Sequence, residues 1–166
     1  DIDSDVVTCS ATQVLRERTG ICYAKSHLLA ALCRAMQIPT GFCYQVYRID
    51  PAAPATAVHG FTAHYLASQG AWLRLDARGN VGDICAEFSL EEEKLAFPVD
   101  PERGELYIYE TVFDRPAPEV VAALRAFKSR RLLWDNLPDV IPDRHLCSRA
   151  DLEFNASLRS GALSSG

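Results

Sequence analysis

One stretch, residues 19–36, constrains the fold of this chain more than any other. A glycine, Gly20, breaks the preceding segment, and a cysteine, Cys22, follows two positions later. Apolar residues then recur at helical period and form a single stripe. The stripe consists of Leu28, Leu29, Leu32, Cys33 and Met36. The pattern predicts a helix that begins at Cys22 and runs to about Gln37, with this stripe facing the core.

The predicted position of Cys22 at the start of a helix gives this cysteine a special environment. The first turn of a helix has unpaired N–H groups and the positive end of the helix dipole, and both favour an anion. A thiolate is such an anion, and these positions lower the pKa of a thiol below its free value of about 8.5. Most cysteines are simply small buried hydrophobic residues, and Cys33 on the apolar stripe fits that description.

Length and composition restrict the class of protein. The 166 residues suit one domain, and a hydrophobic content of 48% is enough for a real core. The net charge of −5 argues against nucleic acid or an anionic membrane surface as a partner. No apolar run approaches the roughly 18 residues that span a bilayer. We therefore expect neither a nucleic-acid partner nor a membrane partner.

Six cysteines raise the question of compartment. Disulfide frameworks are typical of short secreted chains, whereas this chain is long and rich in core residues. We expect free thiols and a cytoplasmic location. No CxxC pair and no Cys/His cluster at zinc spacing occurs, so we expect no metal and no other cofactor. The sequence shows no signal peptide, and it opens with Asp1 rather than Met, which is compatible with a truncated N-terminus.

The remaining pattern predicts an α+β fold in which the Cys22 helix packs on an antiparallel sheet. A short helix over 11–18 is capped by Ser10 and turns Val14 and Leu15 inward. Strands are expected at 42–49, 59–66, 71–76 and 106–110, and a helix at 118–128. Residues 77–99 form a long excursion. We expect residues 1–142 to be one domain and residues 143–166 a flexible tail.

Nucleophilic catalysis by a cysteine needs a base, and the base needs a group that orients it. Two of the four histidines are poorly placed, because His27 faces away from the thiol by about 140° on the same helix and His145 lies in the tail. His59 and His64 lie in one strand and point to opposite faces, so only one of them can face the Cys22 helix.

The register of the predicted hairpin favours His59 over His64. A turn at 67–70 pairs Leu66 with Ala71 and brings Asp76 diagonally opposite His59, within side-chain reach. A shift of one residue in the register would favour His64 instead. Both histidines therefore stay candidates at this point.

Three motifs in the same order resemble the transglutaminase-like superfamily, in particular its small bacterial members on a papain-like scaffold. The first is Gly20-Ile21-Cys22-Tyr23-Ala24-Lys25 before an Ala/Leu-rich helix that ends in Ile38-Pro39. The second is His59-Gly60-Phe61. The third runs from Gly70 to Asn80 and contains a G-x-W-x-x-x-D pattern that ends at Asp76. The resemblance covers Thr8 to Asn80.

The resemblance implies Cys22 as the nucleophile, His59 as base and then acid, and Asp76 as the group that orients His59. The expected activity is acyl transfer from an amide of a peptide, a protein or a small molecule, through a thioester that water or an amine resolves. Many members carry an acidic residue where this chain has Ala63 and His64.

Two further questions stay open at the level of the sequence. The side chain that donates to the oxyanion is not identifiable; Gln13 and Gln45 are candidates beside the backbone N–H of Cys22. The alternative to an enzyme is a binding module that keeps the fold without catalysis, and a metal-binding or redox role lacks the ligand spacing it needs.

Overall fold

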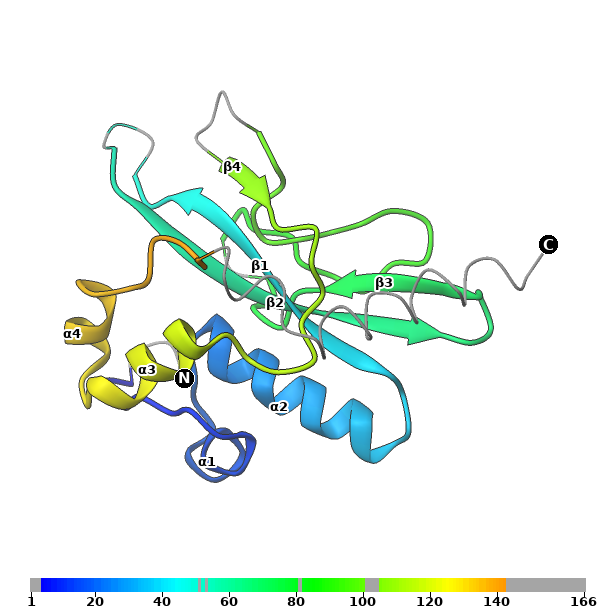
Figure 1. Ribbon diagram of the computed structural model, residues 1–166, viewed down its shortest axis with the longest axis horizontal. Helices are drawn as coiled ribbons and strands as arrows, with labels where there is room; N and C mark the ends of the chain where they lie inside the picture. The colour runs from blue at the N-terminus through cyan, green and yellow to red at the C-terminus, as the bar shows by residue number, and fades with distance from the viewer. Residues whose placement is uncertain (1–3, 51, 53, 81, 101–104, 143–166) are drawn as a thin grey trace.

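A four-stranded antiparallel sheet with helices on one side forms the centre of the molecule (Figure 1). The structure is a computed structural model that describes residues 4–50, 52, 54–80, 82–100 and 105–142. The strands are β1 (Thr40–Arg48), β2 (Thr56–Leu66), β3 (Ala71–Leu75) and β4 (Glu105–Ile108), in the order β3-β2-β1-β4. The helices are α1 (Ala11–Glu17), α2 (Cys22–Ala35), α3 (Pro118–Ala126) and α4 (Arg130–Trp134). The predicted α+β class is confirmed.

Helix α1 begins where its cap predicts. The Ser10 side chain accepts from the Gln13 N–H at 3.2 Å, and the Gln13 side chain accepts in turn from the Ser10 N–H at 3.0 Å. This reciprocal capping box satisfies donors that a helix start leaves free. The expectation that Leu15 faces inward is wrong, because this short helix turns only Val14 to the core and leaves Leu15 63% exposed.

Helix α2 begins at Cys22 as predicted, but the predicted apolar stripe is not its buried face. Leu32 and Met36 are 50% and 73% exposed. The buried residues are Tyr23, Ala24, Ser26, His27 and Ala30. Small and hydrogen-bonding side chains replace large aliphatic ones here, because this face of the helix lies close against the backbone of β2 and bonds to it.

The edge of β2 explains that close approach. The predicted pairing of Leu66 with Ala71 is confirmed, and β3 ends at Leu75 opposite Thr62. Beyond that point no strand of the described residues pairs with β2 on this side. The Ser26 hydroxyl donates to the Gly60 carbonyl at 3.2 Å, and the Tyr23 hydroxyl donates to the Val58 carbonyl. Side chains of α2 thus bond to backbone groups that a longer β3 would have paired.

Each face of the sheet has its own core. On the helical side, Phe42, Tyr44 and Val46 pack with residues of α2, α3 and α4. On the other side, Phe61 and Ala63 pack with Leu95 from the excursion after β3. Leu133 and Ile141 are fully buried in the first core, so the described chain up to Ile141 packs against this sheet. The boundary at 142 stays a prediction, because His145 and the rest of residues 143–166 lie outside the described residues.

Candidate active site

The thiol of Cys22 lies at the first residue of α2, over the open edge of β2. The preceding residue, Ile21, makes no side-chain cap, so its side chain does not bind the N–H groups of the first turn. The Gly60 N–H of the strand edge lowers the pKa of this thiol. A backbone donor of the strand edge therefore favours the thiolate, and so does the positive end of the α2 dipole.

His59 and Asp76 form a buried pair beside the thiol. The imidazole Nε2 donates to the Asp76 Oδ2 at 2.7 Å, and the two residues are 1% and 8% exposed. The same carboxylate accepts from the Ala96 N–H at 3.0 Å and the Arg78 N–H at 2.8 Å. With both of its oxygens hydrogen-bonded, Asp76 is held in place and fixes the orientation of the imidazole.

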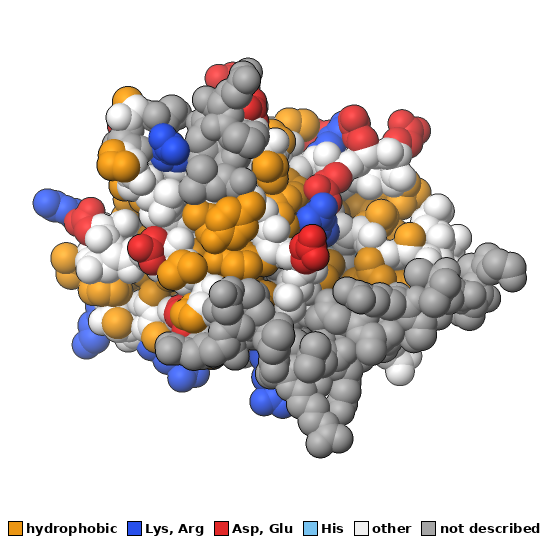
Figure 2. All heavy atoms as spheres, turned by 45° about the horizontal axis from the view of Figure 1, so that its top comes forward, with side chains coloured by type: hydrophobic (Ala, Val, Ile, Leu, Met, Phe, Trp, Pro, Cys, Tyr) orange, Lys and Arg blue, Asp and Glu red, His pale blue; other side chains and the backbone are white. Residues whose placement is uncertain are grey.

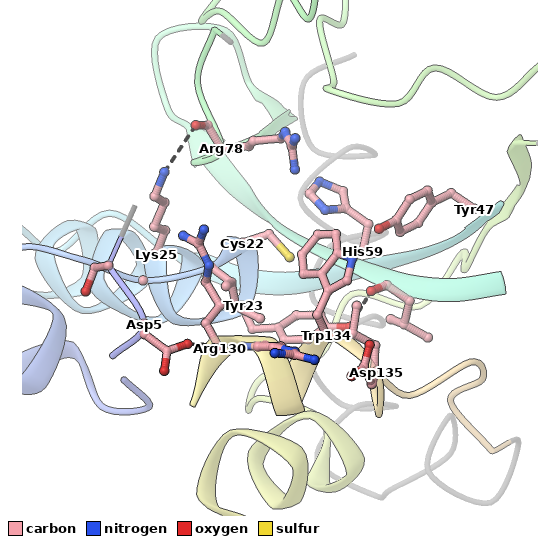
Figure 3. Close-up of a pocket in the computed structure, with 16 residues that line it drawn as sticks. Asp5, Cys22, Tyr23, Lys25, Tyr47, His59, Arg78, Arg130, Trp134 and Asp135 are labelled. Carbon is pink, nitrogen blue, oxygen red and sulfur yellow. Dashed lines mark hydrogen bonds between the residues drawn. The ribbon is translucent and has the colours of Figure 1, made fainter. Parts of the chain in front are cut away.

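The second nitrogen of His59 is left for the thiol. Nε2 is already bound to Asp76, and the imidazole interacts electrostatically with Cys22, so Nδ1 is the ring nitrogen available to the thiol. Figure 3 shows the sulfur beside the imidazole ring. The structure thus brings together Cys22, His59 and Asp76, the three residues that the family resemblance implies.

The route by which His59 meets the thiol differs from the prediction. The face of β2 that contacts the body of α2 is the Gly60 face, where a Cβ would lie 2.7 Å from the Tyr23 ring. Because strand residues alternate, His59 points to the other face. It still reaches Cys22, because the thiol lies over the strand edge rather than over either face.

The other two described histidines are placed elsewhere. His64 lies within hydrogen-bond distance of the Thr40 and Thr62 hydroxyls, at 3.1 Å and 2.7 Å. Burial lowers the pKa of His64 to about 4. His27 Nδ1 lies 2.6 Å from the Cys9 carbonyl, and burial lowers its pKa. No hydrogen bond of the described residues links either ring to Cys22.

Opposing electrostatic effects act on the thiol and the imidazole. Burial raises the pKa of Cys22. The charge and hydrogen bonding of His59, together with the Gly60 N–H, lower this pKa by more than burial raises it, so the pKa lies below its usual value. Burial lowers the pKa of His59, but Cys22 and Asp76 raise it to about 9. The two shifts favour a thiolate–imidazolium pair around neutral pH.

Asp76 stays ionised beside this pair. Burial raises the pKa of its carboxyl group, but the hydrogen bond and charge of His59 and the N–H groups of Arg78 and Ala96 outweigh that effect. The pKa of Asp76 therefore lies below its usual value. An ionised carboxylate at this position stabilises the imidazolium.

Aromatic rings surround the imidazole. The Phe97 ring meets it edge-on with 4.9 Å between centroids, and Phe61 stacks at 6.0 Å. Tyr47 lies 6.3 Å away and stacks on Phe97 at 4.5 Å. Gln45 anchors this wall, because its Nε2 donates to the Phe97 carbonyl at 2.6 Å. These rings shield the bond between His59 and Asp76 from water.

A pocket of about 580 Å³ opens over the thiol (Figure 3). Cys22, His59 and Tyr47 form its reactive side. The remaining lining comes from the N-terminal segment, from Lys25 on α2, from Arg78 after β3 and from the region of α4. A substrate in this pocket reaches the sulfur directly.

The two glutamines considered as oxyanion donors make other contacts in the structure. Gln13 closes the capping box of α1, and Gln45 holds Phe97. Neither lines the pocket.

Sequence reasoning missed Tyr47, Phe97 and Arg78. Gln45 pairs with His59, so Tyr47, two residues further along β1, lies on the same face of the sheet as His59. The sequence did not predict this register, because a Pro-rich loop separates β1 from β2. Phe97 lies in the irregular excursion, where no periodicity points to it. Arg78 stands two residues after Asp76, and its place within the third motif, Gly70 to Asn80, was its only signal.

Comparison with known proteins agrees with the architecture. A cysteine-bearing helix on an antiparallel sheet is the arrangement of a transglutaminase-like core. Residues 3–77 match the family model of the transglutaminase-like superfamily. The match spans Cys22, His59 and Asp76. No curated protein and no solved structure matches the chain.

The described residues show neither a metal centre nor a membrane-spanning helix. Within the described ranges, no group of His, Cys, Asp or Glu side chains is arranged to hold a metal ion. No helix in the described part of the chain has the length and apolar character to cross a bilayer.

Proposed function

We propose that this protein is a cysteine acyl-transfer enzyme that acts on amide bonds through a thioester on Cys22. The observation that carries the proposal is the buried, hydrogen-bonded pair of His59 and Asp76 beside Cys22, with Cys22 and His59 lining an open pocket. The transglutaminase-like domain supports the same chemistry, because the superfamily often is enzymatic. No cofactor takes part in the proposed reaction.

In the first half-reaction the thiolate attacks the carbonyl carbon of the amide. A C–S bond forms, and the carbonyl electron pair moves to the oxygen. As this intermediate collapses, the His59 imidazolium gives its proton to the leaving nitrogen, and the C–N bond breaks. The products are an amine and a thioester on Cys22. Proton transfer of this kind contributes roughly 10²–10⁴-fold to the rate.

The second half-reaction reverses the roles. Neutral His59 takes a proton from water or from an acceptor amine, which attacks the thioester carbonyl. The thiolate leaves and the pair with the imidazolium is restored. Water gives hydrolysis, as in a protease or amidase, and an amine gives transamidation.

We propose two donors for the oxyanion. One is the backbone N–H of Cys22 at the start of α2. The other is the Tyr47 hydroxyl, which points toward the reactive side of the pocket in Figure 3. Burial and the nearby thiolate raise the pKa of Tyr47 to about 12, so its hydroxyl keeps its proton and donates.

A nucleophilic thiol must stay reduced, and we propose a reducing cytoplasm as the compartment. The five cysteines in the described part of the chain are free. They are Cys9, Cys22, Cys33, Cys43 and Cys85.

The proposal is tested with p-nitrophenyl acetate, an activated acyl donor that reports acylation before the natural substrate is known. We expect a burst of nitrophenolate equal to the enzyme concentration, an acetyl group on the Cys22 peptide, and then slow turnover. Adding cadaverine separates the two outcomes, since N-acetylcadaverine marks transamidation and acetate marks hydrolysis.

Cys22→Ala is the control for this experiment. The burst and the acetylated peptide disappear in this variant if Cys22 is the nucleophile. Equal release of nitrophenolate by the parent and by Cys22→Ala would contradict the proposal. That result would favour a binding module that keeps the fold.

A further inference from the structure

We infer that the substrate carries a carboxylate close to the reacting amide, and that Arg78 binds it. This inference rests on the proposed acyl-transfer function. It adds the class of substrate, which neither the fold nor the cysteine chemistry specifies.

Arg78 is held beside the reactive groups. Its backbone N–H donates to the Asp76 Oδ1 at 2.8 Å, and its carbonyl accepts from the Lys25 Nζ at 3.3 Å. The guanidinium carbon lies 5.1 Å from the centroid of the Phe97 ring. Because Phe97 also packs against His59, both cations share one aromatic neighbour, and Figure 3 shows the guanidinium near the imidazole.

The guanidinium of Arg78 has an N–H donor without an acceptor in the described part of the chain. Its Nε is buried and has no hydrogen-bond partner, and among the described residues no carboxylate forms an ion pair with it. Buried donors are normally hydrogen-bonded, so we expect an acceptor atom of a bound ligand to pair with this one. The planar fork of an arginine matches the two oxygens of a carboxylate.

The rest of the pocket also has an excess of positive charge. Apart from Arg78, the cationic side chains of Lys25, Arg130 and Arg131 line it, against the two carboxylates of Asp5 and Asp135. Asp5 is already engaged, because its Oδ1 accepts from the Ser129 hydroxyl at 3.0 Å and the Arg131 N–H at 3.3 Å.

This local excess is unexpected in a chain of net charge −5. Figure 2 shows several Lys and Arg side chains along the lower edge of the face drawn, with most Asp and Glu side chains higher up. A cationic pocket in an acidic protein attracts anionic ligands and repels cationic ones.

Paired alkylating probes of equal size test the inference. Iodoacetate carries a carboxylate and iodoacetamide does not, and each forms a C–S bond with the Cys22 thiolate as iodide leaves. We measure the ratio of their rate constants at Cys22. Arg78→Gln is expected to lower the ratio of iodoacetate to iodoacetamide by about tenfold, the contribution of one hydrogen-bonded charge.

Controls identify the source of the effect. Arg115→Gln removes an exposed arginine that does not line the pocket and should leave the ratio within about twofold of the parent. Arg78→Lys, which keeps the charge without the fork, should give an intermediate ratio. Using a ratio cancels any general change in the reactivity of Cys22.

Longer probes distinguish the two sources of a carboxylate. Iodoacetyl-glycine against iodoacetyl-glycinamide reports a chain-terminal carboxylate. The iodoacetyl derivative of glutamic acid α-amide against that of glutamine amide reports an acidic side chain. The pair whose ratio depends more strongly on Arg78 identifies the class.

Failure of the inference and failure of the proposed function look different. Rapid alkylation by iodoacetamide with the same ratios in the parent and Arg78→Gln would overturn the carboxylate inference alone. A Cys22 that reacts with iodoacetamide no faster than an ordinary thiol would overturn the proposed function, and the inference with it.

Discussion

At the scale of single residues, the reactivity of Cys22 depends on a few groups that lower the pKa of its thiol and so oppose the effect of burial. Burial opposes the thiolate, whereas His59 and the Gly60 N–H favour it. His59 does this only while Asp76 holds its ring, and Asp76 is in turn held by two backbone N–H groups. Each residue in this series is therefore positioned by the next.

Removing the Tyr47 hydroxyl separates acyl transfer from thiol reactivity. Tyr47→Phe keeps the ring that stacks on Phe97 and loses the proposed oxyanion donor. We expect kcat/KM for p-nitrophenyl acetate to fall about 10²-fold, the usual effect of losing one such donor. Alkylation by iodoacetamide forms no oxyanion and should fall far less. Equal losses in both reactions would assign Tyr47 a role in positioning the thiol instead.

At the scale of the elements, the start of α2 and the hairpin of β2 and β3 were predictable from local signals. A glycine before a periodic stretch marks a helix start, and a turn of four residues fixes a register that places His59 near Asp76. Both signals lie within a few residues of the structure they determine.

The buried face of α2 was not predictable in the same way. Hydropathy ranks Leu32 and Met36 above Ser26 and Tyr23, yet the latter two are buried because they bond to the edge of β2. That edge is open only because β3 is short. A sequence pattern cannot show which backbone groups of a distant strand lack a partner.

Gly60 tests the close approach of α2 and β2. A Cβ at this position would lie 2.7 Å from the Tyr23 ring, whose hydroxyl is bonded to the Val58 carbonyl. We expect Gly60→Ala to lower the free energy of unfolding by about 1–3 kcal/mol, the usual cost of overpacking, measured by urea denaturation.

A double-mutant cycle isolates the contact between Gly60 and Tyr23. In a Tyr23→Ala background the ring is absent, so Gly60→Ala should cost clearly less there. The same cost in both backgrounds would show that the glycine is needed for another reason.

At the scale of the whole molecule, the site joins parts of the chain that are distant in sequence. Helix α2, the hairpin and the excursion after β3 all contribute, and the Ala96 N–H reaches back to Asp76 across 20 residues. The described residues of the excursion form no helix or strand, so the packing of Leu95 and Phe97 against the sheet was not predictable from periodicity.

The buried carboxylate of Asp76 links this assembly to acid stability. Its pKa lies below the usual 3.8 in the folded protein, because burial is outweighed by His59 and the two N–H donors. It therefore contributes stability above about pH 4, which is lost as the pH falls through the folded pKa. The slope is at most about 1.4 kcal/mol per pH unit.

Asp76→Asn removes this titration. We expect the free energy of unfolding of the parent, from urea titrations between about pH 5 and pH 3, to fall more steeply than that of the variant. The variant should be less stable at the upper end of this range. Parallel curves would mean that Asp76 does not have the lowered pKa that its contacts require.

The pH dependence of Cys22 alkylation by iodoacetamide, followed by peptide mapping, tests the central claim most directly. Exposed Cys85 serves as the reference thiol within the same chain. In the parent we expect the Cys22 rate to rise with an apparent pKa well below 8.5. In His59→Ala, burial acts on the thiol without the opposing imidazolium, so the profile should move above 8.5 and the rate at pH 7 should fall more than about tenfold. A Cys22 that reacts like an ordinary thiol and ignores the loss of His59 would contradict the account.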